Sequence, residues 1–338
     1  MFKIVQWILK AGIAGIVSLT ILTAITIVYS HSGAHVTNGT GATDYKWESY
    51  QFRSNMTEGF SWLWMNGDGF NNSFEIADSE SVDVLLMGSS HMEAVNVAKN
   101  RNVGFLLNES FAELTTYNIG ISGHTIYQCV NNLPNAISYY NPEKYIIIET
   151  DRIDLDGKKM RSVLEDKMEH IPSHDSGLMY AVQKYIPCFL PLYRELGNWI
   201  SSSISAVNAG KVNDENSIEI DIDEAYRETL NGFIERISDT ANGRQVIIFY
   251  HPETIIDEAG NFGEDEDIVA EFERVCGENG IMFVDMYDDF KELYNRKNKL
   301  AHGFINTAVG YGHLNNEGHR LVADRLANII GALENGVE

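Results

Sequence analysis

A run of small polar residues follows an aliphatic stretch early in the chain. Residues 82–87 read VDVLLM, and Gly88, Ser89, Ser90 and His91 come directly after them. A serine hydroxyl is a weak nucleophile at neutral pH, and it needs an imidazole within hydrogen-bond reach to take its proton. The pattern therefore indicates nucleophilic chemistry at Ser90, with Ser89 directed backwards. The alternative is a serine that only caps the helix expected from MEAVNVA.

Four further aliphatic runs indicate the elements that position such a site. They are TTYNI (115–119), YIIIE (145–149), QVIIFY (245–250) and IMFVD (281–285). Near-continuous aliphatic runs are typical of strands covered on both faces, so the chain is expected to form an α/β domain with a flavodoxin-like doubly wound, five-stranded parallel sheet. Ligands of such sheets bind beyond the carboxyl ends of the strands. The polar clusters that should meet there are GSSH (88–91), NIGISGHT (118–125), ETDRID (149–154), HPET (251–254) and GYGHLNNEGH (310–319).

Three of these clusters, in this order, resemble the blocks of the SGNH, or GDSL-like, serine hydrolases. The resemblance runs from about residue 82 to 335, with one long interruption. It makes Ser90 the nucleophile and His313, in HLNNEGH, the general base. Gly123, the last glycine of NIGISGHT, would offer its backbone N–H to the oxyanion, together with the N–H of Ser90. The resemblance thus implies the SGNH hydrolase fold and acyl-enzyme chemistry.

The acid that normally orients the catalytic histidine is missing from its usual place. The family has an aspartate three residues before that histidine, and this chain has Gly310 there. Either the enzyme works as a Ser–His dyad, or an acid from another loop orients His313. The candidate acids are Asp151, Glu253 and Asp285.

The third block, ETDRID, matches the family pattern loosely. Asp151 stands where the family has an asparagine, and an ionised carboxylate has no proton to donate to an oxyanion. Thr150, Arg152 or backbone N–H groups are the possible substitutes, and Asp151 would otherwise support a histidine. His91 is either a supporting donor beside the nucleophile or an exposed side chain, and His319 is expected on a helix surface.

The amino terminus predicts a membrane anchor. Residues 11–29 carry no charge, and as a helix they would reach about 28 Å, close to the thickness of a bilayer core. Lys3 and Lys10 precede this run, so the positive-inside rule places the amino end in the cytoplasm and the remainder outside. A cleaved signal peptide is the alternative to this uncleaved signal anchor.

The anchor divides the expected organisation into three parts. Residues 1–30 form the cytoplasmic stub and transmembrane anchor, 31–46 a flexible stalk by composition, and 47–338 the hydrolase domain. The aromatic residues within 47–80 are expected at the domain edge. A helical insertion at about 155–240 is either a lid or extra helices packed on the sheet, and a closing helix is expected over 317–336.

Composition argues against several functions. The formal net charge of −23 would repel a phosphate backbone, so no nucleic-acid partner is expected. The cysteines at 129, 188 and 276 lack metal-like spacing and are expected as buried thiols. No HExxH pattern, P-loop or dinucleotide-binding motif is present, so neither a metal nor a cofactor is expected.

These features predict a membrane-anchored, extracellular SGNH-type serine esterase or O-acyltransferase. The expected partners are the membrane and an acylated glycan or other ester substrate, with acetyl esters of cell-surface polysaccharides favoured by analogy with the family. The alternative is a catalytically degenerate protein of the same fold that binds a glycan or a partner within a surface assembly complex.

Overall fold

The computed structural model describes residues 2–336, apart from 32, 77–81, 112, 152–154, 169–176, 190–221, 257–258 and 264–266. Its centre is a parallel sheet made from the five aliphatic runs. The strands are β6 (Val84–Met87), β7 (Thr116–Asn118), β8 (Tyr145–Thr150), β9 (Gln245–Tyr250) and β10 (Met282–Asp285). Their order is β10-β9-β8-β6-β7, and all neighbours are parallel. The predicted doubly wound sheet is confirmed, and its order reverses beside β6, where GSSH begins.

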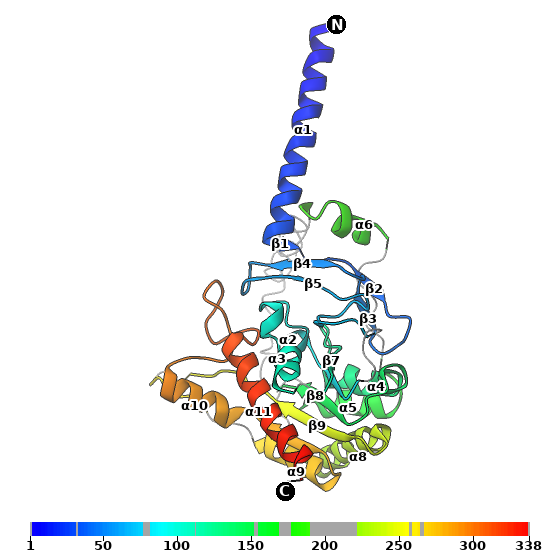
Figure 1. The fold of residues 1–338 in the computed structure, drawn as a ribbon, viewed down its shortest axis with the longest axis vertical. Helices are drawn as coiled ribbons and strands as arrows, with labels where there is room; N and C mark the ends of the chain where they lie inside the picture. The colour runs from blue at the N-terminus through cyan, green and yellow to red at the C-terminus, as the bar shows by residue number, and fades with distance from the viewer. Residues whose placement is uncertain are drawn as a thin grey trace, which may run out of the picture.

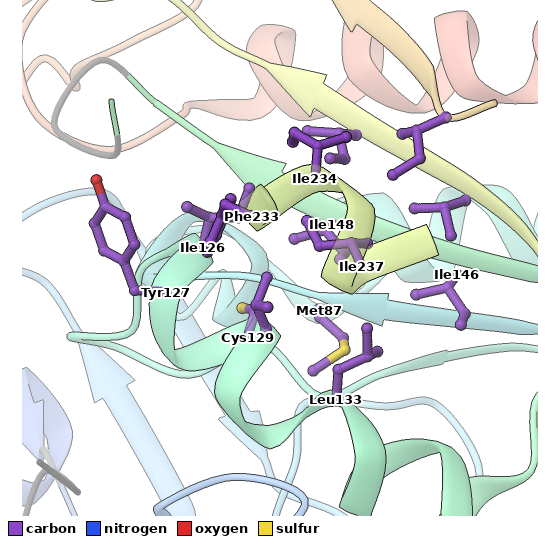
Figure 2. Packing of buried hydrophobic residues seen from close by; sticks show 14 of the residues in the cluster. Met87, Ile126, Tyr127, Cys129, Leu133, Ile146, Ile148, Phe233, Ile234 and Ile237 are labelled. Carbon is purple, nitrogen blue, oxygen red and sulfur yellow. The ribbon is translucent and has the colours of Figure 1, made fainter. Parts of the chain in front are cut away.

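Helices cover both faces of this sheet. One face packs against α4 (Ile126–Tyr140), α5 (Gly157–Leu164), α8 (Glu224–Ala241) and α9 (Asp267–Glu278). The other packs against α3 (Val103–Ser110), α10 (Tyr287–Lys297) and α11 (Asn316–Glu334). Successive residues of one strand point to opposite faces of the sheet. Met87 therefore packs in the core with α4 and α8, while Leu86 packs in the core with α11. Figure 2 shows the first of these cores, with Ile146 and Ile148 against Phe233 and Ile237.

The predicted insertion contains helices that belong to the sheet. α5 and α8 bury Met160, Val163, Phe233 and Ile237 in the core, so α8 is the crossover helix between β8 and β9. These two described helices of the insertion therefore pack on the sheet and do not form a lid. α6 (Leu178–Tyr185) lies apart from them, beside the end of α1 (Figure 1). The rest of the insertion lies outside the described residues.

The segment before the parallel sheet is folded. β1 (Ser30–His31), β4 (Phe52–Asn55) and β5 (Ser61–Trp64) form one antiparallel sheet, and β2 (His35–Thr37) pairs with β3 (Tyr45–Trp47) in another. The flexible stalk expected over 31–46 is thus replaced by strands and by fully buried side chains at Ala34 and Ala42. The small residues of this segment permit close packing, whereas composition alone predicts flexibility.

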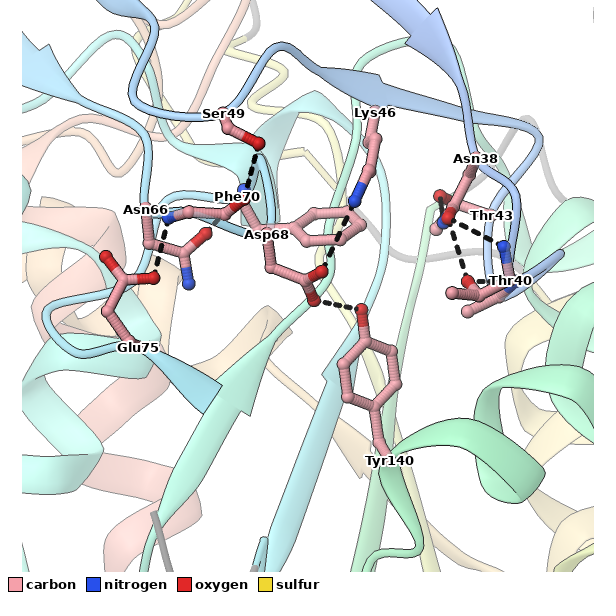
Figure 3. A network of polar contacts seen from close by, with 12 residues as sticks. Asn38, Thr40, Thr43, Lys46, Ser49, Asn66, Asp68, Phe70, Glu75 and Tyr140 are labelled. Carbon is pink, nitrogen blue, oxygen red and sulfur yellow. Dashed lines mark hydrogen bonds and ion pairs between the residues drawn. The ribbon is translucent and has the colours of Figure 1, made fainter. Parts of the chain in front are cut away.

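Polar contacts fasten this segment to the parallel sheet. Asp68 accepts a hydrogen bond from Tyr140 of α4 at 2.8 Å and pairs with Lys46 at 3.3 Å (Figure 3). It also accepts a hydrogen bond from Tyr117 of β7 at 3.2 Å. Burial and the nearby Asp68 carboxylate raise the pKa of both tyrosines, so each stays a donor. The aromatic-rich amino-terminal segment is therefore an integral layer of the domain.

A long apolar helix projects from this layer. α1 (Phe2–Tyr29) has a mean hydropathy of 2.2 over its best window, and no residue of that window is buried (Figure 1). By length and composition it is able to cross a membrane, as an anchor or as a signal sequence. Its last turn continues without a break into β1.

Candidate active site

Ser90 and His313 meet at the carboxyl end of β6. Ser90 begins the short helix α2 (Ser90–Glu93), and its Oγ lies 2.9 Å from Nε2 of His313. The hydroxyl of Ser89 caps α2 by accepting the His91 N–H at 3.1 Å. The first N–H groups of a helix are not used inside it, so the Ser90 N–H is free of the helix ladder and suits an oxyanion donor. The contact required by the sequence interpretation is present.

Glu58 lies on the other side of the His313 ring. Its Oε2 is 2.8 Å from Nδ1 of His313, and its Oε1 accepts the His313 backbone N–H at 2.9 Å. The Nδ1 contact has ion-pair distance but is not aligned as a hydrogen bond in this conformation. Burial acts to raise the pKa of Glu58, but its contacts with the His313 ring and backbone N–H outweigh burial and hold the pKa below its ordinary value. An ionised carboxylate therefore faces the imidazole.

The turn between β4 and β5 presents Glu58. Asn55 Oδ1 accepts the N–H groups of Thr57 and Glu58 at 3.1 Å each, which closes the start of the turn. Asn306 holds its end, because its side chain accepts the Gly59 N–H at 3.0 Å and donates to the Met56 carbonyl at 2.9 Å. Two segments far apart in sequence are thus joined at the site.

Glycines make room for the carboxylate. Gly312 has φ +94°, and a Cβ there would lie 2.5 Å from Glu58 Oε1. Gly310, which stands where the family has its aspartate, has φ +85° and donates its N–H to the His302 carbonyl at 3.0 Å. A side chain at 310 would point towards Leu300, 2.9 Å from the added Cβ. This backbone path explains why the acid comes from elsewhere.

The orienting acids proposed from the sequence take other places. Asp285 Oδ1 accepts the Tyr287 N–H at 2.8 Å at the start of α10. Asp151 and the exposed Glu253 line a cavity of about 220 Å³ that His313 also lines. Neither has a described contact with Nδ1 of His313, which Glu58 occupies. Sequence reasoning missed Glu58 because it precedes the first family block.

Three more histidine rings surround His91: the ring centroids of His251, His302 and His313 lie 4.4, 5.9 and 5.2 Å from its own. One ring nitrogen each of His91, His251 and His302 lies within 4.8 Å of the others. The sequence motifs did not predict this cluster, because the three residues are far apart in the chain. His91 Nδ1 accepts the Leu314 N–H at 3.1 Å, so the neutral ring carries its proton on Nε2 and offers a donor there. Burial holds the pKa of His91 and His302 well below the ordinary value, which keeps both neutral. His91 is therefore a partly buried supporting residue of the His313 loop.

Glu149 at the end of β8 ties this cluster to the nucleophile loop. It accepts the N–H and hydroxyl of Ser89 at 2.6 and 2.7 Å and contacts His251 Nε2 at 2.7 Å. Burial lowers the pKa of His251, but Glu149 outweighs this effect and raises it above the ordinary value. A Cβ on Gly88 would collide with Glu149, so glycine is required at that position.

The second block packs directly on α2. Asn118 donates to the Met92 carbonyl at 2.6 Å, and the Ile121 N–H donates to the Gly88 carbonyl at 3.0 Å. Gly123 follows two residues later with φ +85°. Its role as an oxyanion donor stays a prediction.

The third block contributes less than expected. Thr150 is 1% exposed, and among the described residues its hydroxyl has no hydrogen-bond partner. Arg152 lies outside the described residues. The oxyanion roles assigned to these two residues stay predictions.

No family model and no curated protein matches the chain. Solved structures do match. One is a member of the lipolytic protein G-D-S-L family from Veillonella parvula, with 17% identity over 75% of this chain and 97% of that chain, at a TM-score of 0.39. Another is an acetyl xylan esterase, with 15% identity over 73% and 98% and a TM-score of 0.40. A third is a peptidoglycan O-acetylesterase, with 15% identity over 66% and 47% and a TM-score of 0.35.

The fold is SGNH/GDSL-like. The sheet order and the meeting of the first and last blocks at the end of β6 agree with the resemblance seen in the sequence. None of the three TM-scores reaches 0.5, so these neighbours carry no conclusion about activity.

Proposed function

We propose that this protein is a serine esterase or O-acyltransferase with a Ser90–His313–Glu58 triad. The observation that carries the proposal is the continuous chain of contacts from Ser90 Oγ through the His313 ring to the Glu58 carboxylate, at 2.9 and 2.8 Å. Nucleophile, base and orienting acid stand in the order that acyl transfer needs.

The reaction follows from these contacts. Ser90 Oγ attacks the ester carbonyl carbon while His313 Nε2 takes the hydroxyl proton, and Glu58 stabilises the imidazolium that forms. The Ser90 N–H, with Gly123 as the proposed second donor, stabilises the oxyanion. Loss of one such donor typically costs about 10²- to 10³-fold in rate. His313 then protonates the leaving alcohol, and water or an acceptor hydroxyl cleaves the acyl-enzyme.

The proposed substrate is a short acyl ester, such as an acetyl ester, of a cell-surface glycan. The small cavity beside His313, about 220 Å³, supports a short acyl group over a long chain. Acetylated sugars are the first substrates to test, because the family resemblance of the sequence favours them. We place the domain outside the cell, with α1 as an uncleaved anchor.

A fluorophosphonate probe tests the proposal on the full chain in detergent micelles. An activated serine becomes covalently modified, whereas a binding protein of the same fold stays unlabelled. We expect labelling of the wild type and of Ser110→Ala, a matched change at an exposed serine in α3, and no labelling of Ser90→Ala. Equal labelling of Ser90→Ala and the wild type would refute the assignment.

Product analysis then separates the two activities. The chain is incubated with an acetylated oligosaccharide, with and without an unacetylated one. Free acetate identifies an esterase, and acetate transferred to the second sugar identifies a transferase. If the chain is unlabelled and forms neither product, the degenerate binding protein is the better description.

A further inference from the structure

The sheet β1-β4-β5 presents one uncharged aromatic face on the side of α1. Cross-strand partners point to the same face of a sheet, and the register pairs Phe52 with Trp64 and Ser54 with Trp62. Trp62 and Trp64 are 58% and 60% exposed, although they belong to a folded sheet. The opposite face carries Arg53 and Leu63, which are buried on the domain. The exposed face therefore points away from the hydrolase domain.

Hydrogen bonds join this face to the end of α1. Ser54 Oγ donates to the Ile27 carbonyl at 2.6 Å, and the Trp62 indole N–H donates to the Val28 carbonyl at 2.9 Å. The Met56 N–H donates to the Tyr29 carbonyl at 2.9 Å. The face thus lies at the level where α1 ends and is held there by the last residues of the helix (Figure 1).

Further exposed aromatic residues lie on or beside the last turns of α1. Tyr29 at the end of α1 is 55% exposed. Beyond α6, Cys188 accepts a hydrogen bond from Thr23 of α1 at 3.4 Å, and the neighbouring Phe189 is also exposed. Tryptophan and tyrosine concentrate at membrane–water interfaces, because their rings are apolar at one end and polar at the other.

We propose that the face formed by Phe52, Trp62 and Trp64 docks on the bilayer that α1 spans, at the depth of the lipid headgroups. The occupant is the lipid surface because the face is continuous with the exit of α1 and carries no charge in a chain whose formal net charge is −23. This docking rests on the proposed anchoring by α1. It holds the β4–β5 turn, and with it Glu58, close to the membrane, so the substrate reaches the triad at the membrane surface.

Tryptophan fluorescence in nanodiscs tests the docking. The full chain carries Trp7→Phe, which removes the exposed tryptophan of α1, and is placed in phosphatidylcholine with or without bromine near the top of the acyl chains. We expect the brominated lipid to quench part of the emission, and Trp62→Phe with Trp64→Phe to remove that quenched part. The same two residues should be shielded from acrylamide in nanodiscs compared with the urea-unfolded chain.

A control residue lies on α4, outside the sheet β1-β4-β5. Tyr139 is 49% exposed near the end of α4, at the amino-end rim of the parallel sheet. Tyr139→Trp, added to the variant lacking the tryptophans at 7, 62 and 64, should be quenched by acrylamide and not by brominated lipid. If Trp62 and Trp64 respond to both quenchers as this control does, the docking is wrong.

The two proposals fail separately. Absence of fluorophosphonate labelling in the wild-type chain would overturn the proposed function without changing the quenching. Absence of quenching in a chain that is still labelled would overturn the docking alone. Circular dichroism of each variant confirms that it is folded before either result is scored.

Discussion

A carboxylate oxygen of Glu58 lies 2.8 Å from Nδ1 of His313, although the two residues are 255 positions apart in the chain. The contact supplies the acid that the loop before His313 lacks. It also makes the amino-terminal layer part of the candidate active site, because Glu58 is carried by the turn between β4 and β5.

Glu58→Gln should lower kcat sharply while leaving the fold intact. The amide no longer stabilises the imidazolium, and the loss of the corresponding acid in serine proteases costs about 10⁴-fold. We expect a fall of roughly 10² to 10⁴, measured with p-nitrophenyl acetate. Glu253→Gln changes an exposed carboxylate at the same cavity and should stay near the wild-type rate. Equal losses in both variants would contradict the role of Glu58.

Gly312→Ala should imitate the loss of Glu58. Its added Cβ would lie 2.5 Å from Glu58 Oε1, so the carboxylate has to move away from His313. Gly243→Ala is the matched control, because Gly243 also has a positive φ, +83°, but open space around the added Cβ. Both variants should lose similar stability in thermal unfolding, and Gly312→Ala alone should lose activity. A fully active Gly312→Ala would show that the carboxylate position does not matter.

Stability should fall as the pH drops below about 6.5. Burial lowers the pKa of His319 to about 3 and holds those of His91 and His302 well below the ordinary value. Between the folded and unfolded pKa values the unfolded chain binds more protons, so acid favours unfolding. His251 acts in the opposite direction, because its pKa is raised and its contribution is present at low pH. The three histidines whose pKa is lowered outweigh the opposite contribution of His251.

His319→Leu measures one of these contributions. From pH 6.5 to 5, protonation linked to His319 alone should cost about 2 kcal/mol in the free energy of unfolding. The variant should therefore show a shallower fall over this interval in urea titrations at each pH. An unchanged slope would contradict a neutral, buried His319.

Removing the first 44 residues should destabilise the domain. A fragment 45–338 lacks β1 and β2, so β4 keeps β5 but loses its other neighbour, and β3 loses β2. The fragment also lacks the buried Ala34 and Ala42. A fragment 30–338 keeps these contacts and serves as the comparison. We expect a lower Tm and more aggregation for the shorter fragment. Equal Tm values would restore the interpretation of 31–46 as a stalk.

The parallel sheet was predictable because its strands are buried on both faces and read as aliphatic runs. The pairing of Ser90 with His313 was also predictable, since strand ends of one parallel sheet converge. Both inferences use patterns that lie within a few residues of each position.

Glu58 and His319 show where such patterns stop. SWLW alternates buried and exposed residues in the structure, but nothing in the preceding NMTEG indicates that the turn reaches a histidine. His319 was expected on a helix surface, yet it is 1% exposed, because α11 turns that side towards His251 and His313. Long-range docking decides both positions, and a local pattern does not record it.

The direct passage from α1 into β1 leaves no flexible linker between that helix and the sheet β1-β4-β5. An enzyme joined to its membrane anchor by a flexible linker can reach polymers far from its point of attachment, after they have been completed. With α1 as the proposed anchor, the active site would instead stand at one fixed height above the membrane, so each acceptor or ester would have to be delivered to that zone. The time at which a glycan is modified would then depend on when the growing glycan passes this zone, rather than on how far the enzyme can reach.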